Sequence, residues 1–270
     1  MCLAVLAWRA HPRYRLIVAA NRDEYHARPT TPLAAWGDPP ILAGRDLEAG
    51  GTWLGVDRGR RFGLVTNFRE MAQRPAGAPS RGALIPDWLA STGSAENYLA
   101  GLAGRAGRFA GFNLLIADRE GLFYASNRGA DLARTLAPGV YGLANHALDA
   151  PWPKLLRVRR GFGRWLALPA YLQSLFALLA DREPVPGDDL PQTGLSPEWE
   201  RALSAPFVVH DRYGTRCSTV VAIGHDDSLE ILERSFGEDG DPSGMASFRL
   251  PPGAWPPAEG SGNPPAPAQL

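Results

Sequence analysis

The chain has 270 residues, and its 28 basic residues balance its 28 acidic ones. Zero net charge argues against nucleic acid or an anionic membrane as the main partner, because both usually select a basic excess. The apolar residues before Trp8 are too few for a signal peptide and follow no basic leader, and no apolar run is long enough to span a bilayer. We therefore expect a cytoplasmic globular protein, long enough to bury a sizeable core.

Cysteine, histidine and lysine are scarce in this sequence. Two cysteines make no disulfide framework, and the five histidines show no paired metal-ligand spacing, so we expect neither a metal site nor a resident cofactor. Lys154 is the single lysine among the 28 basic residues. The heavy use of Arg, Ala, Gly and Pro favours a GC-rich, bacterial genome as the source.

Pairs of apolar runs separated by short polar turns predict a series of β-hairpins. The predicted hairpins span residues 2–20, 52–67, 112–125 and 219–232, and a last strand is predicted at 246–250. Because both strands of most hairpins are almost wholly apolar, we expect them to be buried on both faces.

Apolar residues at i, i+4 spacing predict helices at 84–89, 95–103, 155–166 and 171–179. The helices come in blocks between hairpins, unlike the strand-by-strand alternation of a doubly wound sheet. That order favours an α+β fold in which helices cover antiparallel sheets. We expect one domain over residues 1–250, followed by a disordered tail at 251–270 that is rich in Pro, Gly and Ala.

Cys2 directly follows the initiator Met1. Methionine is usually trimmed before a small side chain, so we expect a mature chain that begins with Cys2. Its α-amine, with an ordinary pKa of about 7.7–8.0, would then act as a base toward the thiol of the same residue. A simpler interpretation of the position alone is a small apolar residue that opens a strand.

A polar cluster, Asn-Arg-Asp-Glu at residues 21–24, follows the second apolar run. We expect the strand to stop there, at an exposed edge. In an antiparallel hairpin the end of the second strand lies beside the start of the first, so the cluster should lie next to Cys2. An aspartate there would hold the α-ammonium and an arginine would favour the thiolate, although an ordinary turn also explains Asn and Asp.

This cluster and four further motifs, taken in order, resemble the NRDE family, also called the transport and Golgi organisation protein 2 family. The further motifs are Gly50-Gly51-Thr52-Trp53-Leu54-Gly55-Val56, Val65-Thr66-Asn67-Phe68-Arg69, Tyr141-Gly142-Leu143-Ala144-Asn145 and Gly214-Thr215-Arg216-Cys217-Ser218-Thr219. The likeness covers about the first 235 residues. The family in turn looks like the N-terminal-nucleophile hydrolases of the choloylglycine hydrolase and penicillin V acylase type.

The resemblance implies a four-layer αββα sandwich of two antiparallel sheets with helices outside. It also implies five catalytic residues, in which Cys2 is the nucleophile, Asp23 holds the α-amine, Asn67 is an oxyanion donor, Asn145 bonds the α-amine or the substrate, and Arg216 raises the thiolate fraction.

The chain departs from that hydrolase pattern at one position. Those hydrolases commonly carry an arginine just before Asn-x-Asp, where this chain has Ala20 and places its arginine inside the motif, at Arg22. The residues expected to line the substrate site are Asn21, Arg22, Trp53 and His146. For Trp53 and His146, a hairpin entry and an ordinary turn are the simpler explanations.

Two functions from different classes follow. In the first, the chain is an N-terminal cysteine amidohydrolase or acyltransferase that acts on a non-peptide amide or a thioester. In the second, which the family resemblance implies through its links to lipid, acyl-coenzyme A or haem handling, the same cleft serves a non-catalytic carrier or chaperone. The sequence leaves the oligomeric state open.

Overall fold

The computed structural model describes residues 2–71 and 77–258. In this part of the chain the strands form two antiparallel sheets, which we call sheet I and sheet II. Sheet I contains, in spatial order, β10 (Gly139–Leu143), β1 (Cys2–Trp8), β2 (Tyr14–Tyr25), β12 (Tyr213–Gly224), β13 (Leu229–Phe236) and β14 (Pro242–Leu250), and β11 (Val209–His210) also pairs with β12. Sheet II contains β3 (Thr30–Ala35), β4 (Ile41–Asp46), β5 (Leu54–Asp57), β6 (Phe62–Asn67), β7 (Phe112–Ala117), β8 (Leu122–Ser126) and β9 (Ala133–Leu136).

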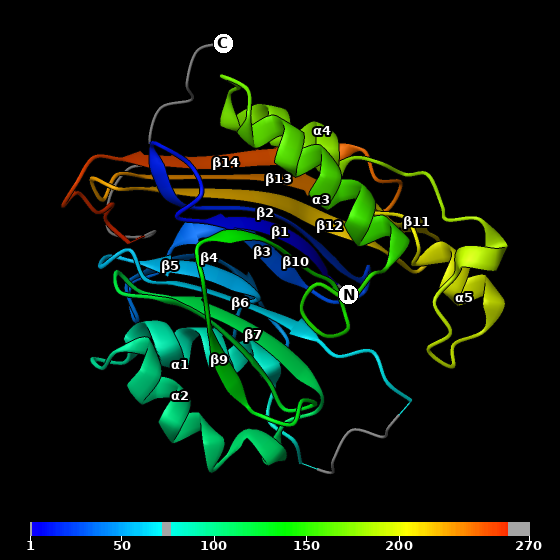
Figure 1. Ribbon diagram of the computed structural model, residues 1–270, viewed down its shortest axis with the longest axis horizontal. Coiled ribbons are helices and arrows are strands. Elements are labelled where there is room, and N and C mark those ends of the chain that lie inside the picture. Colours follow the sequence, from blue (N-terminus) through cyan, green and yellow to red (C-terminus); the bar gives the residue numbers. More distant parts are fainter. Residues whose placement is uncertain (1, 72–76, 259–270) are drawn as a thin grey trace.

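Helices cover the outer face of each sheet, so the molecule has four layers (Figure 1). On sheet I lie α3 (Pro153–Leu166) and α4 (Leu175–Leu179), and on sheet II lie α1 (Leu84–Ala90) and α2 (Ala95–Ala103). The helix α5 (Pro197–Ala202) lies at the end of the sandwich where β1 begins. Short 3₁₀ turns occur at Arg81–Ala83, Ala106–Arg108, Leu172–Ser174 and Gly187–Asp189. None of the helices in the described ranges is long and apolar enough to cross a membrane.

Each central strand is buried on both faces, which explains its nearly continuous apolar sequence. In β1, Ala4 and Leu6 face the core between the sheets, whereas Leu3 and Val5 face the helices of sheet I. Sheet II repeats this arrangement toward α1 and α2, where Trp88 is fully buried. The predicted αββα sandwich is therefore confirmed, as are the four hairpins and the four predicted helical segments.

The prediction that the second strand stops before residue 21 is wrong. β2 continues to Tyr25, pairs with β12 along this stretch, and buries Asn21, Arg22 and Asp23 almost completely. Polar side chains are tolerated there because β12 and the helical layer supply hydrogen-bond partners, as Ser218 does for Asn21. The cluster is thus the interior of a long strand.

Residues 251–258 of the predicted tail lie against the sandwich. Trp255 packs on the core between the sheets, and Arg60 Nη2 donates to the carbonyl oxygens of Pro251 and Ala254, each at 3.1 Å. Residues 259–270 lie outside the described residues, and the single domain over 1–250 stays a prediction.

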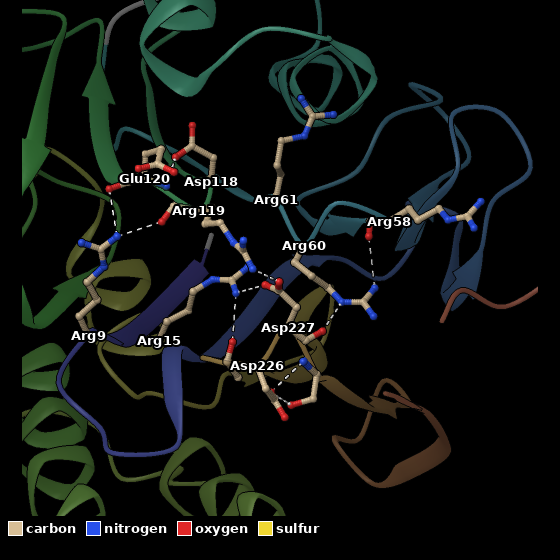
Figure 2. Close-up of polar contacts among 12 residues, drawn as sticks. Arg9, Arg15, Arg58, Arg60, Arg61, Asp118, Arg119, Glu120, Asp226 and Asp227 are labelled. Carbon is tan, nitrogen blue, oxygen red and sulfur yellow. Dashed lines mark hydrogen bonds and ion pairs between the residues drawn. The ribbon is translucent and has the colours of Figure 1, made fainter. Parts of the chain in front are cut away.

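At the end of the sandwich away from Cys2, charged side chains tie the hairpin turns together (Figure 2). Asp227, in the turn between β12 and β13, forms ion pairs with Arg15 and Arg119, and its carbonyl oxygen accepts from Arg60 Nε at 2.8 Å. Arg9 Nη2 donates to the carbonyl oxygen of Arg119 at 2.9 Å. We call these residues the turn cluster; it links sheet I to sheet II.

Candidate functional site

A polar pocket of about 150 Å³ lies where β1 begins and β2 and β6 end. We call it the Cys2 pocket. Cys2, Asp23 and Asn67, which come from three different strands, all line it, together with Arg22 and Trp53. Antiparallel pairing brings the start of β1 level with the end of β2, as the hairpin geometry predicts.

Arg22 stands directly opposite Cys2 in the pairing of β1 with β2, so both side chains project on the same face of sheet I. The Arg22 side chain is only 5% exposed. Its guanidinium carbon lies 4.4 Å from the ring centroid of Trp53, within cation–π distance. Cys2 therefore has a buried cation as its neighbour across the strand pair.

Asp23 is the most buried carboxyl group of the pocket and is held by β12. Its Oδ1 accepts from Thr215 Oγ1 at 2.7 Å, and its backbone oxygen accepts from the hydroxyl of Tyr213 at 2.7 Å. Burial raises the pKa of Asp23, while the positive charge of Lys154 and the Thr215 hydrogen bond oppose the rise.

Lys154 is a member of this site that the sequence analysis did not select. It is 2% exposed near the start of α3, and its Nζ donates to the carbonyl oxygen of Leu203 at 2.8 Å. Burial lowers the pKa of Lys154 to about 8, and the charges of Asp23 and Cys2 act in the opposite direction. A signal was present in the sequence, because Lys154 lies four residues before Val158 on the buried stripe of α3.

Asn67 and Asn145 form a hydrogen-bonded pair of amides. Asn145 Nδ2 donates to Asn67 Oδ1 at 2.8 Å, which leaves Asn67 Nδ2 as the donor of that side chain. Asn145 is fully buried, and its Oδ1 has no hydrogen-bond partner among the described residues. Because β10 pairs Leu143 with Ala4, Asn145 comes level with Cys2, on the side opposite β2.

Cys2 is partly buried, and its thiol lies near charges of both signs. Desolvation raises the pKa of the thiol most, Asp23 and Glu24 add to the rise, and Arg22 lowers it. The thiol is therefore largely protonated near neutral pH unless a base accepts its proton.

Four predicted site residues do not line the Cys2 pocket: Asn145, whose amide contacts Asn67, and Asn21, His146 and Arg216. Asn21 points toward the helical layer, where its Nδ2 donates to the carbonyl oxygens of Leu179 and Pro206. His146 is exposed and packs between aromatic rings. Arg216 belongs to a neighbouring pocket, because its Nη1 donates to the carbonyl oxygens of Tyr25 and His26 at 3.0 and 3.1 Å. The sequence gives residue types, but a bulge of β12 between Thr215 and Cys217 decides where Arg216 points.

Trp53, one of the residues expected to line the substrate site, belongs with Thr52 to the wall of the Cys2 pocket. Thr52 N donates to the carbonyl oxygen of Gly82, which also lines the pocket, at 3.0 Å. A Cβ on Gly51 would come within 2.4 Å of the Gly82 backbone, so this close approach requires glycine.

Two further pockets border the Cys2 pocket. The Arg216 pocket, of about 380 Å³, shares Arg22 and Trp53 with it. The Trp199 pocket, of about 480 Å³, shares Glu24, Asn67 and Arg81 with it and is lined by aromatic and aliphatic side chains of α5 and its surroundings. In the described parts of the chain no group of three or more His, Cys, Asp or Glu residues is arranged to hold a metal ion.

Comparison with known proteins identifies the group to which this arrangement belongs. The family model described as Transport and Golgi organisation 2 matches residues 1–238. The chain belongs to the Transport and Golgi organisation 2 family. The family match covers every strand that contributes to the Cys2 pocket, and it confirms the predicted NRDE resemblance.

Curated relatives from the Transport and Golgi organisation 2 family align along nearly their whole length. The chain is 33% identical over 260 residues to the Transport and Golgi organization protein 2 homolog of Bos taurus and 32% identical over 263 residues to that of Homo sapiens. It is 24% identical over 262 residues to Transport and Golgi organization protein 2 of Drosophila melanogaster. These alignments cover 87% of this chain and 92–93% of each relative.

The predicted bacterial source is contradicted by these relatives, which are animal proteins. The prediction rested on the bias toward Arg, Ala, Gly and Pro. Such a bias reflects the base composition of coding DNA and is not a property of one kingdom.

Proposed function

We propose that this protein is an N-terminal cysteine acyl-transfer enzyme, an amidohydrolase or acyltransferase that acts on a non-peptide amide or a thioester. The observation that carries the proposal is the shared pocket of Cys2, Asp23 and Asn67. A nucleophile, a carboxylate and an amide donor within one small polar pocket are the groups that thiol acyl transfer requires. The four-layer αββα arrangement supports the relation to N-terminal-nucleophile hydrolases that the motif order implies.

The proposed reaction begins with removal of Met1, which frees the α-amine of Cys2. The amine takes the proton of Sγ, and Sγ attacks the carbonyl carbon of the substrate. The carbonyl oxygen gains the negative charge and accepts a hydrogen bond from Asn67 Nδ2. The C–N or C–S bond then breaks as the ammonium returns the proton to the leaving group, and water or an amine releases the acyl group from Cys2.

Other residues in and beside the pocket support these steps. Asp23 would hold the α-ammonium, and Asn145 Oδ1, which is buried without a partner among the described residues, would accept one of its N–H groups. Arg22 would take the thiolate-stabilising role that the family pattern gives to Arg216, since it is the arginine that lowers the pKa of the Cys2 thiol. We place the reaction in the cytoplasm, where a thiol stays reduced.

A second candidate function is non-covalent binding of acyl-coenzyme A, a lipid or haem. It is favoured by the desolvation that raises the pKa of the Cys2 thiol and by the apolar wall of the Trp199 pocket, formed by Leu195, Trp199 and Leu203. A chain that keeps Met1 would have no α-amine at Cys2 and hence no base.

The two candidates are separated by mass spectrometry of the intact protein. The mass first determines whether the chain begins at Cys2. Incubation with a panel of acyl thioesters and amides should then add one acyl group to the wild type and to Cys217→Ala, and none to Cys2→Ala. Cys217 is the matched control because it is a free cysteine of the same sheet.

A protein that begins at Cys2 and forms neither adduct nor product with any member of the panel would contradict the acyl-transfer proposal. Retained Met1, together with ligand binding that Cys2→Ala does not change, would establish the second candidate.

A further inference from the structure

Two arginine side chains converge beside the Cys2 pocket without a carboxylate partner. Arg22 and Arg216 both line the Arg216 pocket, and Arg22 is a cause of the lowered pKa of Arg216, after desolvation. The ion pairs formed within residues 2–71 and 77–258 include neither of them. Two neighbouring guanidinium groups repel each other, and an anion bound between them would relieve this repulsion.

The Arg22 guanidinium is also incompletely bonded. Arg22 is only 5% exposed, and its Nη1 is buried without a hydrogen-bond partner within the described residues. A buried N–H of a charged group that makes no hydrogen bond destabilises the protein, because the group has lost its hydration without a replacement. The ring of Trp53 stacks on one face of the guanidinium but accepts no conventional hydrogen bond, so the cost is not removed.

The rest of the Arg216 pocket is suited to an oxyanion. Arg216 is fixed through Nη1 by backbone carbonyl oxygens, and hydroxyl groups of Thr30, Thr31 and Ser235 also line the pocket. The carboxyl group in its wall, Glu233, is 2% exposed and already accepts from Leu33 N at 2.6 Å and from Thr219 Oγ1 at 3.0 Å. Burial raises the pKa of Glu233, which weakens its competition for the arginines.

We propose that Arg22 and Arg216 form a binding site for an anionic group of the substrate, a carboxylate or a phosphate. Guanidinium groups bind both anions through paired N–H donors. A pocket of about 380 Å³ has room for such a group and for the chain that carries it.

The register of sheet I sets the distance between this group and the reacting carbonyl. Arg22 stands opposite Cys2 on one side and opposite Cys217, the neighbour of Arg216, on the other. Adjacent strands lie about 4.8 Å apart, so the anion would bind roughly 5–10 Å from the nucleophile. If the proposed function holds, the substrates are amides or thioesters in which a carboxylate or phosphate lies at that distance from the reacting carbonyl.

The test compares two probes of equal chain length, the N-acetylcysteamine thioesters of glutaric acid and pentanoic acid, which differ in a terminal carboxylate or methyl group. The rate of acylation of Cys2 is followed by intact mass. We expect wild type to react roughly 10- to 100-fold faster with the glutaryl probe, as for a charge-assisted hydrogen bond. This ratio should fall toward one in Arg216→Met, recover in part in Arg216→Lys, and stay high in Arg249→Met, whose arginine is exposed on β14 outside both pockets.

A second measurement does not depend on catalysis. Glutarate or inorganic phosphate should raise the Tm of the wild type in a saturable manner relative to pentanoate or chloride at equal ionic strength, and Arg216→Met should lose this rise. Comparison of glutarate with phosphate identifies the preferred anion.

The outcomes separate the two claims. Equal acylation by both probes, with no saturable Tm rise, overturns the anion site and leaves the acyl-transfer function standing. If neither probe acylates Cys2, the proposed function fails and the Tm measurement alone decides the anion site: a rise that Arg216→Met abolishes supports it, and its absence overturns it.

Discussion

Lys154 places an ammonium group in the interior, where it and the carboxyl group of Asp23 stabilise each other's charged forms. Each group alone would be expensive to ionise there. Lys154 is the only lysine in the sequence, so its titration can be followed without interference from other lysines.

Replacement of Lys154 by methionine should change how stability depends on pH. The folded pKa of about 8 lies below the unfolded value of about 10.4, so the unfolded chain binds more protons between these two values. The contribution of Lys154 to stability therefore rises with pH over this window, by about 3 kcal/mol. Urea unfolding at pH 7–10.5 should show the wild type gaining stability relative to Lys154→Met, and parallel curves would contradict the buried, shifted lysine. Titrations of groups that do not interact with Lys154 are common to both proteins and cancel in the difference.

Asn67→Ala tests the proposed oxyanion donor. Loss of one such donor typically lowers the rate about 10²–10³-fold, and we expect that decrease in the acylation of Cys2. The matched control is Asn97→Ala on the exposed surface of α2, which should leave the rate unchanged. A rate for Asn67→Ala within twofold of wild type would remove Asn67 from the mechanism.

The sequence was informative about the site where residue type and strand order suffice. Hairpin geometry alone predicts that residues 22 and 23 lie beside Cys2. In the structure Cys2, Asp23 and Asn67 line one pocket. The displacement of Arg216 depends on a bulge, which has no local sequence signal here. Lys154 was passed over because its contacts, such as that with Leu203, lie far away in the sequence.

At the scale of secondary-structure elements, a buried ion pair anchors α5 beside the pocket. Arg69 Nη1 and Glu200 Oε2 lie 2.9 Å apart, with both side chains about 95% buried. Glu200 Oε1 also accepts from Thr193 N at 2.8 Å, so α5 and the preceding loop are attached to the end of β6. The pair thereby fixes the wall of the Trp199 pocket.

Removal of one partner of this pair should be more harmful than removal of both. Glu200→Met removes the carboxylate that lies 2.9 Å from the buried Arg69 guanidinium, and loss of one partner of a buried ion pair typically costs about 3–5 kcal/mol in the free energy of unfolding. The double variant Arg69→Met/Glu200→Met should cost less, because no uncompensated charge remains. Denaturant unfolding of the single and double variants measures the difference. As a control, Asp87→Asn breaks the exposed pair with Arg105 and should cost less than about 1 kcal/mol.

Several of the elements that the sequence missed are short or exposed. The strand β14 was predicted only from residue 246, although it begins at Pro242, because its first residues are exposed and show no apolar alternation. The strand β3 carries a proline and exposed threonines, and α5 has only six residues, too few for a helical period to appear. Long apolar strands and helices were predictable because burial on both faces leaves a continuous apolar pattern.

At the scale of the whole molecule, the sandwich has two dissimilar ends. One end holds the Cys2 pocket, and the other is closed by the turn cluster of Asp227, Arg15, Arg60, Arg119 and Arg9 (Figure 2). Partial burial tends to raise the pKa of Asp227, but hydrogen bonds and ion pairs with Arg15 and Arg119 outweigh it and lower this pKa. The cluster joins the sheets where the apolar core between them ends.

Asp227→Asn should remove a part of the resistance to acid. The folded pKa of Asp227 is below the unfolded value of about 3.9, so its contribution is fully present above that value and is lost as pH falls through the folded pKa. We expect a loss of about 1–2 kcal/mol at pH 7, because Arg119 is largely exposed and adds little. Urea unfolding at pH 2–7 should show the deficit shrinking toward low pH. An equal deficit at every pH would point to packing instead, and Asp188→Asn, an exposed residue, serves as the control.

The position of β1 has a practical consequence. It is an inner strand, flanked by β10 and β2, and its first residue opens into a pocket of only about 150 Å³. An affinity tag fused ahead of Cys2 would begin at this pocket and would convert the α-amine of Cys2 into an amide, which removes the proposed base. Purification handles therefore belong at the carboxyl end, and a failed assay on amino-terminally tagged material does not test the proposed acyl transfer.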